Sequence, residues 1–223
     1  MKGITFEDLL TNKRLHSYDD LKLILNSKEI GSPETKVNKI DIPGGDSSLD
    51  LTDFFGEPKY EDLTHKFYFS TIVKQAQFLS LFSTVKNALH GKKMRIILDD
   101  DPLFYYVGRI KVSSFTNEKN IGIISIECDC EPYKYKLNPM FYSVTMPETS
   151  TKEITLLNGR KRTVPEVTIA ADSNFNIVYQ GSNVWDLGSG SYMLPELELV
   201  EGENYVTITG KGTITFTWQE ANL

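Results

Sequence analysis

Three consecutive aspartates, Asp99, Asp100 and Asp101, are the side chains in this sequence best suited to chemistry. Carboxylates bind Ca²⁺ or Mg²⁺, or act together as a general acid and base. Pro102 follows them directly, and the spacing of an EF-hand loop is absent. Solvated acidic residues are common at turns, so we favour a hairpin turn here and expect no metal site. A metal-dependent hydrolase using these aspartates is the alternative.

Other nucleophiles, bases and metal ligands are scattered. His16, His65 and His90 lie far apart, and no HExxH, GxSxG or phosphate-binding glycine loop occurs. Cys128 and Cys130 point to one face of an expected strand, too close for a disulfide and too few for structural zinc. We interpret them as buried thiols and expect neither an enzyme nor a cofactor. A site assembled from distant residues stays open.

One tryptophan, Trp185, lies in a loop-like run of Asn, Asp, Gly and Ser at 183–190. An aromatic ring in such surroundings can stack on the apolar face of a sugar. A core tryptophan at the edge of a loop is the interpretation we favour. A glycan contact made by Trp185 is the alternative.

Charge and hydropathy exclude several classes of protein. The 223 residues carry a net charge of −6, with 19 basic and 20 acidic residues in 1–136 against 5 and 10 in 137–223. Neither part is basic enough for sequence-specific nucleic-acid binding. No stretch approaches the ~18 apolar residues of a membrane span, and the start lacks a signal-peptide pattern. We therefore expect a soluble protein, cytosolic when synthesised.

The first part reads as strands around a single helix. Apolar residues at three- and four-residue steps predict a helix over 74–90, with Gly91 at its C-terminal end. Strands are predicted at 21–25, 65–69, 94–98, 104–112 and 122–130, with a turn at 26–31 and a strand end at 131–133. The helix is expected to pack on a sheet.

The second part has the sequence pattern of a β-sandwich, with short strands at regular spacing. Pro139 and Pro147 mark 137–150 as a connector. Beyond it, short strands are predicted at 167–170, 177–179, 196–200, 205–209 and 213–218, the last two joined by residues 210–212. The chain is thus expected to be mainly β, with domains at 1–136 and 151–223.

Between the first strands lies a segment that is polar, turn-rich and poor in core residues. Val37, Ile40 and Ile42 lead to Pro43, Gly44, Gly45 and Asp46, which cannot continue a strand ladder and predict an exposed hairpin tip. A polar stretch follows to residue 62.

Five motifs in this first part resemble siphophage distal tail proteins. They are IPGGDSSLDLT at 42–52, LHGKK at 89–93, LDDDP at 98–102, YYVGR at 105–109 and CDCEPYKY at 128–135. They occur in the family's order and cover about residues 1–136. One departure is Leu63-Thr64, where the family often has an Arg-Thr or Arg-Ile pair. Leu63 cannot make the charged contacts of that arginine.

The resemblance implies an N-terminal β-sandwich with one helix and a protruding hairpin arm, followed by a galectin-like β-sandwich. It implies a ring of six copies around the tail channel, in which the arm embraces a neighbour. On this chain the arm falls near 41–60. The implied interface residues are Ile42, Pro43, Gly44, Gly45, Asp46, Leu49, Asp50 and Leu51.

The function implied is that of a structural hub at the phage tail tip or baseplate. Its expected partners are its own copies in a homo-hexamer, the tail tube protein, the tail-tip hub protein, and receptor-binding or fibre proteins. DNA would pass through the ring without sequence-specific binding, and no membrane is involved. The expected location is the virion tail tip, after assembly in the bacterial cytoplasm. A carbohydrate-binding module for host cell-wall glycan is the alternative function.

Overall fold

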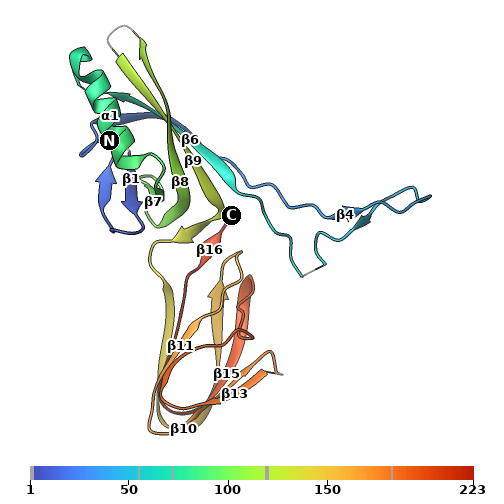
Figure 1. The fold of residues 1–223 in the computed structure, drawn as a ribbon. Helices are drawn as coiled ribbons and strands as arrows, with labels where there is room; N and C mark the ends of the chain where they lie inside the picture. The colour runs from blue at the N-terminus through green and yellow to red at the C-terminus, as the bar shows by residue number, and fades with distance from the viewer. Residues whose placement is uncertain (1–2, 55, 72, 119–120, 182) are drawn as a thin grey trace. The chain divides into compact units, whose positions relative to one another are not determined.

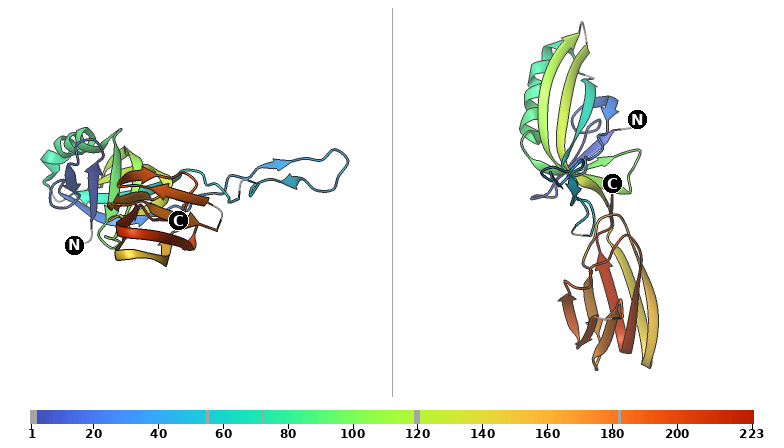
Figure 2. Two further views of the ribbon diagram at one scale, coloured as in Figure 1. Left: turned by 90° about the horizontal axis from the view of Figure 1, so that it is seen from below. Right: turned by 90° about the vertical axis from the view of Figure 1, so that its right-hand side faces the viewer.

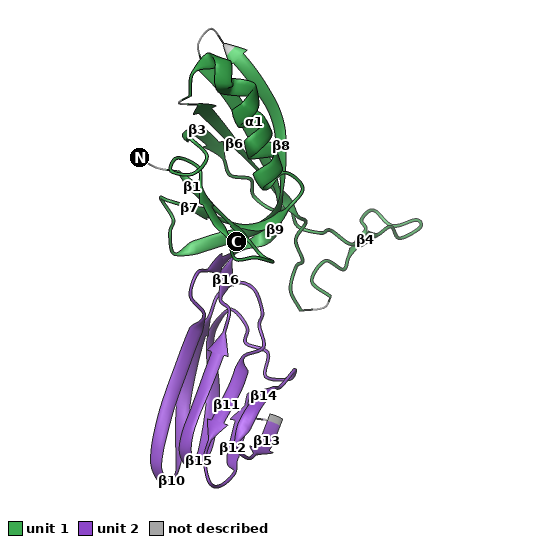
Figure 3. Ribbon diagram, turned by 60° about the vertical axis from the view of Figure 1, so that its left-hand side comes forward, with its two compact units in different colours: residues 1–134, 223 green, residues 135–222 purple. Residues whose placement is uncertain are grey.

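The computed structural model describes residues 3–54, 56–71, 73–118, 121–181 and 183–223. The chain divides into two compact units, residues 1–134 with 223 and residues 135–222 (Figure 3). The described part is mainly β, which confirms the expected fold class (Figure 1). No helix in the described ranges is long and apolar enough to cross a membrane.

Unit 1 is built on one curved sheet in the order β2-β1-β7-β8-β9-β6-β3. The strand bounds are β1 Ile4–Asp8, β2 Arg14–His16, β3 Leu23–Glu29, β6 Leu63–Thr71, β7 Lys93–Leu98, β8 Phe104–Glu118 and β9 Ile121–Lys136. Side chains alternate strictly along β6, where Leu63, His65, Phe67 and Phe69 are buried. This period-two pattern gives the sheet its buried face.

Helix α1 (Phe78–Leu89) follows the short 3₁₀ helix η1 (Gln75–Gln77) and packs against this sheet. Phe78, Val85 and Leu89 are buried, while Phe82 is half-buried and stacks near Phe115. Gly91 follows with φ +79°, a backbone conformation that suits glycine after a helix end. The predicted helix and its apolar stripe are thereby confirmed.

Unit 2 contains one sheet whose two halves share a pair of long strands, β10 (Met140–Asn158) and β15 (Gly202–Trp218). Residues 213–217 of β15 pair with β11 (Glu166–Ala170), and residues 206–209 pair with β12 (Phe175–Tyr179). Strands β13 (Asn183–Leu187) and β14 (Gly190–Met193) lie outside these, and β16 (Ala221–Asn222) is the last strand. Apolar residues of both halves join one buried cluster. The two inner faces therefore pack together as a sandwich.

Two turns expected from the sequence are bends within strands. Residues 210–212 were expected to join two strands, yet β15 runs continuously through them. Opposite this point, β10 has a register shift between Met146 and Ser150. A Cβ on Gly210 would lie 2.7 Å from the Phe175 ring, so the bend requires a residue without a side chain. Likewise, residues 26–29 of the turn expected at 26–31 belong to strand β3, which has a bulge between Leu25 and Ser27.

The strand predicted at 196–200 is wrong: a turn begins at Pro195, where the Leu197 N–H donates to the Leu194 carbonyl at 2.9 Å, and only Leu199 makes an isolated bridge, with Thr163. The remaining differences concern strand ends. Segment 137–150, expected as a connector, contributes to β10, because Pro147 lies in the irregular stretch where no ladder bond is needed. Strand β9 continues through Pro132, which lies beyond the last pair with β6, Leu63 with Cys130. Strands β1, β2, β13, β14 and β16 were not predicted, nor was the part of β10 beyond residue 150.

Candidate functional site

A long hairpin, which we call the arm, extends from unit 1 over residues 32–62 (Figures 1 and 2). At its base the Lys36 N–H donates to the Lys59 carbonyl at 2.7 Å, beside a bridge between Thr35 and Tyr60. Farther out, β4 (Lys39–Ile40) pairs with β5 (Leu49–Asp50). Backbone bonds thus hold the arm as a two-stranded ribbon.

The distal part of the arm turns at a glycine. The Gly45 N–H donates to the Ile42 carbonyl at 3.0 Å, and Gly44 has φ +81°, which only glycine adopts readily. The sequence predicted an exposed turn here, and residues 42–47 are all exposed. The structure brings the eight expected interface residues together on this distal half of the hairpin (Figure 1). Their role in an interface remains a prediction.

The arm has no hydrophobic core of its own. None of residues 32–54 and 56–62 is buried. Large apolar side chains are instead left in solvent: Val37 is 62% exposed, Ile40 52%, Ile42 51%, Leu49 50% and Phe54 71%. Burying one such side chain stabilises a protein by about 1.5–3 kcal/mol. A hairpin that leaves several exposed has the features of a contact surface.

The arm also differs in charge from the remainder of unit 1. Residues 32–62 contain eight acidic residues and three lysines, and residues 40–57 contain five acidic residues and no basic one. The other residues of 1–134 contain 15 basic and 12 acidic residues. The acidic, apolar arm is therefore electrostatically complementary to the body of its own unit. The interface residues implied by the resemblance did not include Val37, Ile40 and Phe54. These three could have been found from the sequence, because they are apolar residues in a segment that is too polar and turn-rich to bury them.

The three aspartates at 99–101 do not converge. The Asp99 carboxylate accepts the Gly3 N–H at 2.6 Å and lies 3.2 Å from His16 Nε2. Asp100 pairs with Lys28 at 2.6 Å, and Asp101 with Lys134 at 3.1 Å. Each carboxylate therefore binds a different segment of unit 1, as expected for aspartates in a turn. Within the described residues no group of three or more His, Cys, Asp or Glu is placed to hold a metal ion.

Cys128 and Cys130 are free thiols buried on the inner face of β9, as the sequence indicated. Burial raises the pKa of Cys130 to about 12 and also raises that of Cys128 well above its usual range. Thiolates are the reactive form of cysteine, so these thiols are unreactive in the folded protein.

His65 is also buried, opposite Cys128 in the β6–β9 register. Its Nδ1 accepts the Gly31 N–H at 3.1 Å, next to the base of the arm, and its ring meets Tyr106 edge-on at 4.4 Å. Burial lowers the pKa of His65 to about 4. His65 is therefore neutral at physiological pH and has a structural role.

Trp185 lies opposite Ile177 in the β12–β13 pairing and is half-buried against the core cluster of unit 2. This position matches a tryptophan at the edge of a core. The glycan contact stays an untested prediction.

The sequence matches no protein-family model and no curated protein. Among solved structures, the chain is similar to the crystal structure of SPP1 Dit (gp 19.1), described as a paradigm of the hub adsorption apparatus in phages that infect Gram-positive bacteria. The TM-score is 0.70 at 13% identity, covering 98% of this chain and 99% of that one. A chain of the phage P2 baseplate in its activated conformation with Ca has a TM-score of 0.42 at 8% identity, covering 97% of both chains, which is too weak to support an argument.

The comparison with SPP1 Dit shows a shared fold along nearly the whole chain. The resemblance to phage distal tail proteins drawn from the sequence motifs is therefore confirmed for the fold.

Proposed function

We propose that this chain is a structural hub protein of a phage tail tip. It assembles as a hexameric ring that links the tail tube to the baseplate or tail fibre, with no catalytic step. The observation that carries this proposal is the arm, whose apolar residues have no core of their own to join. The shared fold with SPP1 Dit supports it.

The shape of the arm favours a head-to-tail assembly. A surface that protrudes from one side of a protein and binds a different surface of the next copy makes a head-to-tail contact. Such contacts close into a ring when the rotation between copies permits, and otherwise give open filaments. Solution mass and electron micrographs of the purified protein distinguish these products.

The test removes the arm at a point where the chain can be rejoined. Because Thr35 and Tyr60 form a bridge, residues 36–59 can be replaced by a two-residue Asn-Gly turn. We expect six-copy rings from the wild-type chain and monomers from the armless variant, measured by mass photometry and negative-stain microscopy. A wild-type chain that stays monomeric at every concentration, with tail partners present, would contradict the proposal.

The structure supplies an independent folding control for each unit. Both tryptophans, Trp185 and Trp218, belong to unit 2, so their fluorescence reports that unit. Cys128 and Cys130 belong to unit 1 and are buried, so their protection from a thiol reagent reports unit 1. An armless variant that keeps both signals and loses the ring has lost assembly alone. One that still forms rings shows that another surface makes the contact.

A further inference from the structure

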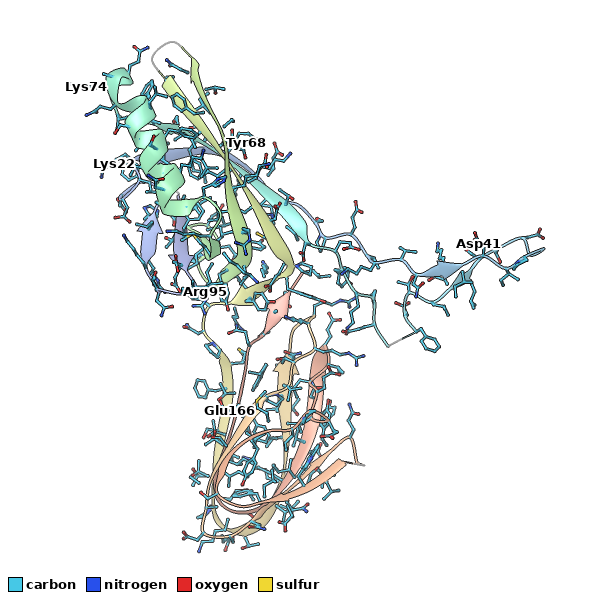
Figure 4. The ribbon with its side chains drawn as sticks, in the orientation of Figure 1. Lys22, Asp41, Tyr68, Lys74, Arg95 and Glu166 are labelled. Atoms are coloured by element: carbon cyan, nitrogen blue, oxygen red, sulfur yellow. The ribbon has the colours of Figure 1, made fainter. Side chains whose placement is uncertain are left out.

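The long strand β10 of unit 2 forms a free edge of its sheet. It pairs with β15 along one side, and the described residues place no strand along its other side (Figures 3 and 4). A free edge presents a row of unpaired backbone N–H and C=O groups, which can pair with another extended chain. Natural sheets therefore carry features at their edges that prevent such pairing.

One half of β10 carries these protective features. Lys152 lies beyond the register shift of β10, and the alternation of the strand puts it on the same face as the buried Ile154 and Leu156. Lys152 itself is exposed. An inward-pointing lysine at a sheet edge opposes the addition of a strand, because the added strand would bury its charge. Pro147 and the register shift beside it interrupt pairing in the same way.

The other half of β10, residues 140–146, has none of these features, and we call it the open edge. It contains no charged residue, no proline and no glycine, and its register with β15 is regular. Other edge strands of the two main sheets are protected. Strands β2, β14 and β16 have two to four residues, β3 contains a bulge, and β13 carries Asp186. The open edge thus differs from them in offering an unobstructed strand.

The apolar side chains of the open edge are incompletely covered. Met140, Tyr142 and Val144 pack against the core cluster of unit 2 but are only half-buried. The residues that pair with them on β15 are all buried, namely Trp218, Phe216 and Ile214. On the outer face of the sheet, Phe141 is 72% exposed. A further strand beside β10 would cover apolar surface that is now in contact with water and would pair the free backbone groups.

The length and charge of the open edge define the segment that it can accept. It is about as long as one ordinary strand of five or six residues. An accepted segment must be extended, since it pairs through its backbone. It must also be uncharged on the side that faces the core cluster, since a charge there would be buried without a partner. Apolar residues at every second position would meet Met140, Tyr142 and Val144.

The symmetry of a ring excludes a second copy in the same ring as the source of this segment. Two identical edges face each other only across a two-fold axis, whereas head-to-tail contacts generate a ring without one. The other edge strands of a neighbouring copy are protected against pairing. The segment must therefore come from a different protein.

We infer that the open edge of β10 binds an extended segment of another tail protein, which adds to the sheet of unit 2 as a further strand. The segment is uncharged and carries an apolar side chain at every second residue. This inference rests on the proposed hub function, since a hub holds other tail components, and it names a surface through which unit 2 holds one.

The first test uses a synthetic peptide with the sequence of residues 213–218. This sequence is uncharged, alternates polar and apolar side chains, and already pairs with β10 on its other side. Added to the full-length protein, the peptide should slow amide hydrogen exchange in residues 140–146 and leave residues 151–158 and 202–218 unchanged. The same peptide with N-methyl groups at alternate residues cannot donate its backbone hydrogen bonds and should give no protection.

The second test places on the open edge the kind of lysine that protects the other half. Val144→Lys should weaken peptide binding by at least about tenfold, because the added strand would bury the charge. The matched control, Thr145→Lys, makes the same change in charge at the next, exposed position and should bind within about twofold of wild type. Conversely, Lys152→Val should extend protection by the peptide into residues 151–158.

A folding control accompanies these variants. The fluorescence of the tryptophans reports whether unit 2 is folded in each one. The methylated peptide needs no change in the protein, so it decides the question even where Val144→Lys does not fold. Equal weakening by Val144→Lys and Thr145→Lys would show that added charge alone governs binding, and would overturn the inference.

The remaining outcomes separate this inference from the proposed function. Rings without protection of residues 140–146 by the peptide would overturn the open-edge assignment and leave the hub proposal standing. Protection by the peptide in a chain that forms no rings would support strand addition at this edge and contradict the hub proposal. Protection of residues 140–146 that increases with protein concentration, without any peptide, would show that a second copy fills the edge, and the inference would be wrong.

Discussion

The arm and the sheet of unit 1 use similar residues to opposite effect. In β6, Phe67 and Phe69 are fully buried in the core, while Phe54 and Ile40 in the arm are 71% and 52% exposed. Both segments are β-ribbons held by backbone bonds. Only the sheet has a helix and neighbouring strands to cover its apolar face. The difference indicates that the sheet stabilises the monomer, whereas the arm adds no buried apolar surface to it.

The largest difference in stability is expected between two alanine variants, one of a phenylalanine in the sheet and one of a phenylalanine in the arm. Phe67→Ala leaves a cavity in the core and should lower the free energy of unfolding of unit 1 by about 3–5 kcal/mol. Phe54→Ala removes an exposed ring and should change it by less than about 0.5 kcal/mol, while weakening assembly. Thiol exposure of Cys128 and Cys130 in urea measures the stability. Equal losses from both variants would show that the arm packs on the body in solution.

A smaller effect is expected from pH, through His65. Its pKa in the folded protein, about 4, lies below the usual 6.5 of an unfolded chain. As pH falls from 6.5 towards 4, the unfolded chain takes up a proton that the folded chain does not bind, so stability is lost in that window. The loss attributable to His65 should approach about 3 kcal/mol near pH 4.

The matched variant for this prediction is His65→Gln, whose side-chain oxygen can still accept the Gly31 N–H. It should lose less stability than wild type between pH 7 and pH 4.5, as measured by hydrogen exchange in peptides of β6 and β9. Parallel losses in the two proteins would mean that other groups set the acid sensitivity.

The smallest effect is expected at the aspartate turn. Asp100→Asn removes one partly exposed ion pair with Lys28, which should cost less than about 1 kcal/mol. Calorimetry should detect no heat when Ca²⁺ or Mg²⁺ is added to the wild-type protein, and assembly should be unchanged in the variant. Metal-binding heat that disappears with Asp100→Asn would revive a metal-dependent role.

Local sequence patterns predicted the helix and the strands that bury one face in the core of unit 1. The helix at 78–89, the alternation in β6 and the buried pair Cys128 and Cys130 all follow from periods of 3.6 or two residues, which sequence displays directly. Glycine and proline were less reliable guides. Gly210, Gly212 and Pro147 accompany a bend in paired strands, and a single sequence cannot separate such a bend from a turn.

For the site, the sequence by itself determined that residues 43–46 form an exposed turn in a segment without a core. It did so because glycine, proline and aspartate there neither continue a ladder nor bury surface. Only the tertiary structure decided which other residues belong with them. The exposure of Val37, Ile40 and Phe54 depends on the arm leaving the body, and His65 meets Gly31 and Cys128 only because β6 pairs with β9 beside the base of the arm. Such distant pairings arise from strand order, which no local pattern encodes.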